Sequence, residues 1–164
     1  MSNNVAEIKE RLDKLKNEAV DIALIEGKKI GIGLAAVIKR RVLNKGISAN
    51  NTLFSPYSDK YKKYLAKKNR GTKNGLEFVK NFEFTGDMWA NFGTSESVDV
   101  KKLSNNIVRI TLKGGSEDSQ NKIDWNSKRE GKSIIEPTDD ELNDAKNDFI
   151  ESLSNELQLL INVG

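Results

Sequence analysis

The sequence predicts an α+β fold, with a long N-terminal helix, an extended basic arm, a small antiparallel sheet and a C-terminal amphipathic helix. Three observations support this prediction. Apolar residues recur every three or four positions over 5–43 and again over 138–161, which is the helical period. Between these segments, apolar and polar residues alternate, which is the period of a strand. At 164 residues the chain has the length of one domain, so we treat 1–164 as a single unit.

The N-terminal helix is predicted over 5–43. One face of it carries the apolar residues Val5, Ile8, Leu12, Leu15, Ala19 and Ile22. Gly27, Gly31 and Gly33 interrupt the helical pattern, although glycine is unfavourable in a helix. They do not follow a strand and lack the full G-x-G-x-x-G pattern of a dinucleotide loop. We therefore interpret them as a bend, or as a place where a neighbouring backbone packs closely.

The segment 44–75 has the composition of a loop, with a short helix predicted from Asp59 to Lys68. The sheet region is assigned to 76–125. Within it, Leu76 to Phe84 is expected to be extended, and Thr85 to Phe92 to begin a short helix.

Two strands are predicted at Val98 to Val100 and at Ile107 to Leu112. In the second, Val108, Ile110 and Leu112 alternate with polar residues. The residues from Glu117 to Lys122 are predicted to form a polar loop, with Ile123 and Trp125 as isolated apolar contacts beyond it. Both helices are expected to pack on one face of this sheet.

The C-terminal helix is predicted over 138–161. Thr138 and Glu141 are spaced as a capping box, and Asp139 and Asp140 suit the positive end of a helix dipole. The apolar face of this helix consists of Leu142, Ala145, Phe149, Leu153, Leu157 and Leu160.

The composition excludes several kinds of chemistry. The chain contains no Cys and no His, so thiolate chemistry, His-dependent nucleophiles and the usual zinc sites are absent. Carboxylate-only chemistry remains open, but capping explains the acids of 139–141. We therefore expect no enzyme activity, no cofactor and no metal site. We also expect no signal peptide and no membrane association, because the start is polar and no apolar run is long enough to span a bilayer.

The strongest charge feature is the stretch Lys60 to Lys73, which contains seven basic residues and no acid. Its tyrosines, Tyr57, Tyr61 and Tyr64, stand at helical spacing and so share one face. The C-terminal helix is acidic in turn. A basic arm and an acidic helix on one chain suit head-to-tail assembly of identical subunits. The candidate interface residues are Tyr57, Tyr61, Lys62, Lys63, Tyr64, Lys67, Lys68, Arg70, Asp140, Asp144 and Asp148.

Two other interpretations of the arm remain open. Basic residues interleaved with aromatic ones are also typical of nucleic-acid contact. A solvated surface whose tyrosines pack on the parent domain has the same composition.

Several short motifs are similar to those of the phage virion-morphogenesis, neck and tail-completion proteins. The similar elements are Leu53-Phe54-Ser55-Pro56-Tyr57-Ser58-Asp59-Lys60-Tyr61, then Lys67-Lys68, then Leu76, then Phe84-Thr85-Gly86-Asp87-Met88, followed by Lys128-Arg129-Glu130-Gly131 and Ile134-Ile135-Glu136-Pro137-Thr138-Asp139-Asp140-Glu141. Their order and spacing resemble the family over 46–160. The sequence departs from the family pattern in three places. Asn51-Thr52-Leu53-Phe54 replaces the usual Trp or Gly, the family's His is absent, and its Arg-Pro-Phe motif is not kept.

The resemblance implies a small α+β structural subunit that forms a homo-oligomeric ring in the head–tail connector, around the genome channel. It implies portal, neck or tail proteins as neighbours, non-specific contact with genomic DNA in the channel, and a place in the virion after assembly in the host cytoplasm. The alternative function is a nucleic-acid-binding module that uses Lys60 to Lys73.

Overall fold

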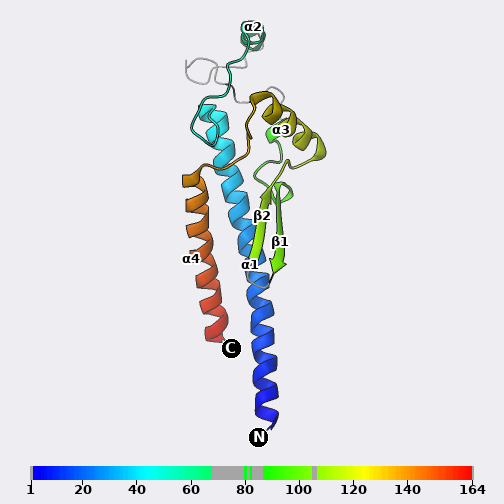
Figure 1. Ribbon diagram of the computed structural model, residues 1–164, viewed down its shortest axis with the longest axis vertical. Coiled ribbons are helices and arrows are strands. Elements are labelled where there is room, and N and C mark those ends of the chain that lie inside the picture. The colour runs from blue at the N-terminus through cyan, green and yellow to red at the C-terminus, as the bar shows by residue number, and fades with distance from the viewer. Residues whose placement is uncertain (1, 68–79, 81, 83–86, 105–106, 164) are drawn as a thin grey trace.

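The computed structural model describes residues 2–67, 80, 82, 87–104 and 107–163 (Figure 1). It confirms the predicted α+β class. In chain order the elements are α1 (Ser2–Lys45), α2 (Asp59–Lys67), the 3-10 turns η1 (Asp87–Trp89) and η2 (Ser95–Ser97), β1 (Val98–Ser104), β2 (Ile107–Leu112), α3 (Glu117–Glu130) and α4 (Asp139–Val163). Among the described residues, no helix is both long enough and apolar enough to cross a membrane.

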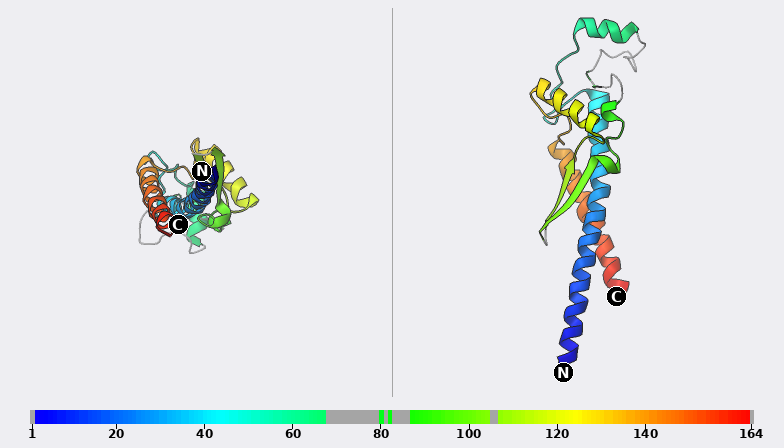
Figure 2. Two further views of the ribbon diagram at one scale, coloured as in Figure 1. Left: turned by 90° about the horizontal axis from the view of Figure 1, so that it is seen from below. Right: turned by 90° about the vertical axis from the view of Figure 1, so that its right-hand side faces the viewer.

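Helix α1 is the spine of the molecule. Its 44 residues correspond to a length of about 66 Å at the standard helical rise. Seen from below, α4 lies on one side of α1 and the β-hairpin on another (Figure 2). Helix α4 therefore packs against α1 and not against the sheet, so the expectation that both helices cover one sheet face is wrong for α4. The physical reason is that a two-stranded sheet is too narrow to bury two helices.

Two of the α1 glycines mark the place where the hairpin packs. A Cβ atom on Gly31 would lie 2.5 Å from Val98 Cγ1 and 2.9 Å from Ile110 Cγ2, and one on Gly27 would lie 3.3 Å from Val100 Cγ1. The helix continues unbroken through both positions. The close approach is therefore made by side chains of this chain's own hairpin, whereas we had expected a bend or a neighbouring backbone. Gly33 has no such contact.

The hairpin is antiparallel, with Val98 opposite Leu112 and Val100 opposite Ile110. Strand β1 runs to Ser104, four residues beyond the predicted end, and its pairing shifts between Lys102 and Ser104. The predicted second strand is confirmed at its bounds. Its alternation reflects one face that packs on α1 and one that faces solvent.

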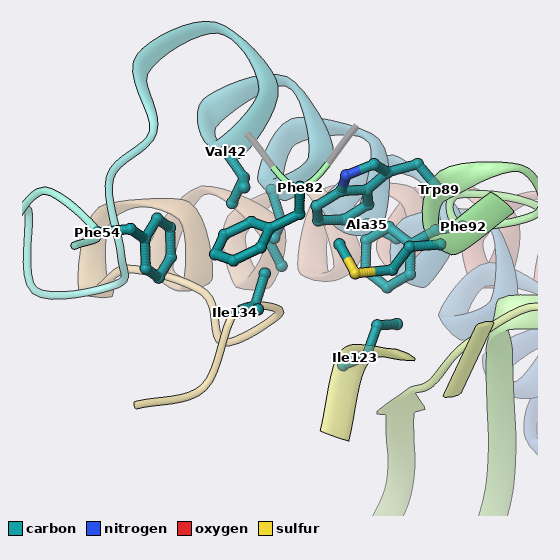
Figure 3. Close-up of a cluster of buried hydrophobic side chains, with 10 residues drawn as sticks. Ala35, Val42, Phe54, Phe82, Trp89, Phe92, Ile123 and Ile134 are labelled. Carbon is teal, nitrogen blue, oxygen red and sulfur yellow. The ribbon is translucent and has the colours of Figure 1, made fainter. Parts of the chain in front are cut away.

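The hydrophobic core lies around the C-terminal half of α1 (Figure 3). Trp89 and Phe92 meet edge to face with their ring centroids 5.4 Å apart, and Phe54 meets Phe82 in the same way at 5.0 Å. The buried members of this cluster are Ala35, Ile38, Val42, Phe54, Phe82, Met88, Trp89, Phe92, Ile123 and Ile134. The core thus joins the C-terminal half of α1 to α3 and to residues of the loops before and after it.

Helix α3 was missed by the sequence analysis. The residues from Glu117 to Lys122, predicted as a loop, form its first half. Ser116 caps it by accepting a hydrogen bond from the Ser119 amide at 3.1 Å, and Gly131 ends it in the left-handed conformation at φ 66°. Ile123 is buried in the core as expected, but Trp125 is exposed and makes no core contact. With so few apolar residues, α3 has no readable helical period.

The predicted start of α4 is confirmed in detail. The Glu141 amide donates to Thr138 Oγ1 at 3.1 Å, and the Thr138 amide donates to Glu141 Oε2 at 2.9 Å. Arg41 of α1 donates from Nε to Glu141 Oε1 at 2.8 Å, and this ion pair is buried. Further down, Ser152 of α4 donates to the buried carboxylate of Glu26. These contacts show that α4 runs antiparallel to α1.

Candidate subunit interface

Of the three tyrosines predicted to share a helix face, Tyr61 and Tyr64 lie on α2, whereas Tyr57 lies two residues before the helix begins. The ring centroids of Tyr57 and Tyr61 lie 4.9 Å apart, and those of Tyr61 and Tyr64 lie 6.2 Å apart. Burial, and then the neighbouring Tyr64, raise the pKa of Tyr61 above its ordinary value. Leu65 is buried, so α2 presents one packed side and one open side.

The open side of α2 is basic. The helix contains four lysines and one aspartate. Lys60, Lys63 and Lys67 are exposed, and their spacing of three and four residues places them in one row. Lys62 is half-buried and lies 3.8 Å from Asp59. Of the other predicted interface residues on the arm, Lys68 and Arg70 lie outside the described residues.

The base of the arm is fixed by a cluster that we call the clasp, which consists of Phe54, Ser55, Tyr57, Lys80, Phe82 and Glu130. Residues on both sides of the arm meet in it. Glu130, at the end of α3, pairs with the buried ammonium group of Lys80 and accepts a hydrogen bond from the Ser55 amide at 2.9 Å. The Phe82 amide donates to the Tyr57 hydroxyl at 3.1 Å. The clasp therefore holds residues 54–57, Lys80 and Phe82 together against α3.

The electrostatics of the clasp depend on Glu130. Burial acts to raise the pKa of this carboxyl, but the hydrogen bonds from Lys80 and Ser55 outweigh it and hold the pKa below its ordinary value. Lys80 Nζ also lies 5.4 Å from the centroid of Phe82 and 5.9 Å from that of Tyr57, within the range of cation–π attraction. With these partners, the buried charge of Lys80 is compensated, and removing Glu130 would leave it uncompensated.

The acidic half of the predicted interface lies on α4. This helix carries seven acidic residues and one lysine, Lys146. Asp140, Asp144 and Asp148 are all exposed, and their spacing of four residues places them in one row on the side turned away from α1. Helix α2 lies beyond the upper end of α1, well away from α4, so the basic row and the acidic row do not meet within the chain (Figure 1, Figure 2).

The described part of the chain offers little for small-molecule chemistry. It contains no group of three or more side chains that could hold a metal ion. Two depressions on its surface are open to solvent and measure about 260 and 440 Å³. The smaller one lies between the loop after α1 and the start of α4 and is lined largely by polar residues, including Ser48, Asn50 and Lys132.

Sequence reasoning missed the charged residues that organise these surfaces. Arg41 donates to Ile47 O and Glu136 O, both at 2.7 Å, besides its pairing with Glu141. Glu26, Lys80 and Glu130 are likewise buried ionic groups. A single charged residue on an apolar helix face was the only available signal for Arg41 and Glu26. Their partners on α4, Glu141 and Ser152, lie 100 and 126 residues away in sequence.

Comparison with known proteins gives no further guidance, since no family model, no curated protein and no solved structure matches this chain.

Proposed function

We propose that this protein is a non-enzymatic structural subunit of a phage virion neck or tail, which assembles head to tail into a ring in the head–tail connector. The observation that carries the proposal is the separation of two complementary charged rows, one on α2 and one on α4. Neither row is neutralised by the other within the chain, and a second copy can satisfy both.

The two rows also match in length. At the helical rise, Lys60 to Lys67 spans about 10 Å and Asp140 to Asp148 about 12 Å. Exposed ion pairs contribute only about 0.2–1 kcal/mol each, so these pairs would set the relative orientation of two subunits more than the affinity between them. The tyrosine face of α2 adds apolar area beside the lysines. A contact between two different surfaces, repeated from copy to copy, closes into a ring when the rotation allows it.

The motif resemblance supports the same proposal. The two motif segments that flank the arm, Leu53 to Tyr61 and Phe84 to Met88, contribute Phe54, Tyr57 and Met88 to the clasp or to the core. Residues typical of the family thus have packing roles here, while Lys60, Lys63 and Lys67 between the two segments are exposed. The place of the ring in the virion, its neighbouring proteins and its contact with genomic DNA rest on the resemblance.

Reciprocal charge reversal tests the assembly. One variant replaces Lys60, Lys63 and Lys67 by Glu, and the other replaces Asp140, Asp144 and Asp148 by Lys. We expect the natural chain to form a closed oligomer by light scattering at low salt and neither variant alone to form one. A mixture of the two variants should assemble again, with alternating subunits, because each reversed row then meets its complement.

Two results would contradict the ring. One is a natural chain that is monomeric at every concentration and salt tested, and the other is an oligomer that neither reversal weakens. Raising the salt to about 1 M shortens the Debye length to about 3 Å and should weaken assembly of the natural chain.

The second candidate function is nucleic-acid binding by α2, which the exposed lysines beside a row of tyrosines favour. It predicts affinity for a DNA duplex or single strand that falls steeply with salt. The lysine reversal should abolish that affinity, whereas the aspartate reversal should not lower it. Fluorescence anisotropy on both variants therefore separates this function from assembly, which needs both rows.

A further inference from the structure

The N-terminal third of α1 lies outside the folded body. Every residue from Ala6 to Asn17 is exposed. Helix α1 extends well past the C-terminal end of α4 (Figure 1). A solvated single helix is only marginally stable, so a segment of this kind usually has a packing partner.

The exposed segment has an apolar stripe. Ile8, Leu12 and Leu15 are 53%, 60% and 37% exposed. Their spacing of four and three residues continues through Ala19 and Ile22 to Glu26, the residue that Ser152 of α4 contacts. The stripe is therefore the continuation of the face by which α1 packs on its own α4. The chain covers the upper part of this face and leaves the lower part open.

The charges beside the stripe argue against pairing of two such stripes with each other. Lys9 and Lys16 flank it on one side and Arg11 on the other. Glu18, on the same side as Arg11, already pairs with Lys14 at 3.8 Å. Two copies of α1 packed stripe to stripe would bring these cations together, and they would repel one another like equal charges at the flanking positions of a coiled coil. The stripe instead suits an acidic helix with exposed apolar residues.

Helix α4 has those properties. Beyond the row that ends at Asp148 it carries two acids, Glu151 and Glu156, and no basic residue. Ile150, Leu157 and Ile161 lie in one row at spacings of seven and four, on the flank of α4 beside its α1 contact. Ile150 and Ile161 are 62% and 69% exposed.

We propose that the segment Ala6–Asn17 of one copy packs along this flank of α4 in a second copy. The contact repeats between chains the α1–α4 packing that already exists within the chain, and it adds apolar area and opposite charge. It uses neither α2 nor the row of Asp140, Asp144 and Asp148. It therefore goes beyond the proposed ring contact and stands or falls separately.

The absence of cysteine from the chain permits a direct test. Single variants Leu12→Cys, Ile150→Cys and Ile161→Cys change exposed positions only, so each should fold. We expect a short bismaleimide to link Leu12→Cys to at least one of the two α4 variants when they are mixed. The yield of this mixed dimer should be at least tenfold above that of a mixture containing Leu53→Cys, an exposed control near the other end of α1.

A second arm tests the charges. Adding Arg11→Glu and Lys16→Glu to Leu12→Cys should lower the mixed-dimer yield at least tenfold, whereas reversing Lys60, Lys63 and Lys67 should leave it unchanged. Linking of Leu12→Cys to itself with equal or greater yield would overturn the proposal, because it would mean that the α1 stripes pair with each other. A yield no higher than that of the Leu53→Cys control would overturn it as well.

Discussion

The two ends of α1 form one continuous helix but are stabilised in different ways. Near its C-terminal end, Ala35, Ile38 and Val42 are fully buried in the core, and Arg41 is held by Glu141. Over Ala6–Asn17, by contrast, not one residue is buried. Both regions have apolar residues at helical spacing, so periodicity alone does not distinguish them.

The difference shows that an apolar stripe on a helix predicts a packing partner but does not predict which segment supplies it. Around Ala35, segments from far along the chain supply it. Around Leu12, the described chain supplies none. Substitutions should therefore lower the free energy of unfolding strongly at the first end, and alter only association at the second.

The largest expected effect is in the core. Phe92→Ala should lower the free energy of unfolding by about 3–5 kcal/mol, because it removes a buried ring that packs on Trp89 and leaves a cavity. Urea denaturation measures the loss. Leu12→Ser is the matched control and should change stability by less than about 0.5 kcal/mol in dilute protein. Equal losses in the two variants would show that the two ends do not differ.

The next effect concerns the clasp. Glu130→Gln should cost about 3 kcal/mol, because it leaves the buried charge of Lys80 uncompensated. It should also reduce the acid sensitivity of the fold. The folded-state pKa of Glu130 is lowered, so its contribution is complete above the unfolded-state value of about 4.3 and is lost as the pH falls through the lower folded-state value.

Thermal unfolding between pH 6 and pH 3 checks the sign. The natural protein should lose more stability on acidification than Glu130→Gln does. The variant should keep some acid sensitivity, because hydrogen bonds from Lys29 and Ser152 likewise hold the pKa of Glu26 below its ordinary value. Parallel curves for the two proteins would mean that Glu130 does not contribute in this way.

The smallest effect compares two glycines on α1. Gly31→Ala should destabilise by about 1–2 kcal/mol, since its Cβ would overlap the buried, rotationally stiff Val98. Gly33→Ala should stabilise by about 0.5–1 kcal/mol, because nothing lies within 4 Å and alanine favours the helix. Chemical denaturation of both variants checks the opposite signs. Stabilisation by both would show that the hairpin moves away from α1 without cost.

The success of the sequence analysis followed the strength of local signals. Helix α1, the second strand and the capping box at Thr138 were all predicted, because periodicity and capping act within a few residues. Helix α3 was missed because its stability comes from Ile123 and from the Ser119 hydroxyl, which donates to Met88 O at 2.7 Å. For the candidate interface, the clustering of the three tyrosines and the exposed acids were predictable, although Tyr57 lies outside α2.

The sequence by itself determined the elements with a strong period, the absence of thiol and imidazole chemistry, and the opposite charges of α2 and α4. Only the tertiary structure decided which apolar stripe is covered and that the hairpin packs against Gly27 and Gly31. It also decided that Glu130 and Lys80 pair at the base of the arm. The physical reason is range. Helical period and charge are properties of neighbouring residues, whereas burial and ion pairing depend on groups that the fold brings together from fifty to a hundred residues away.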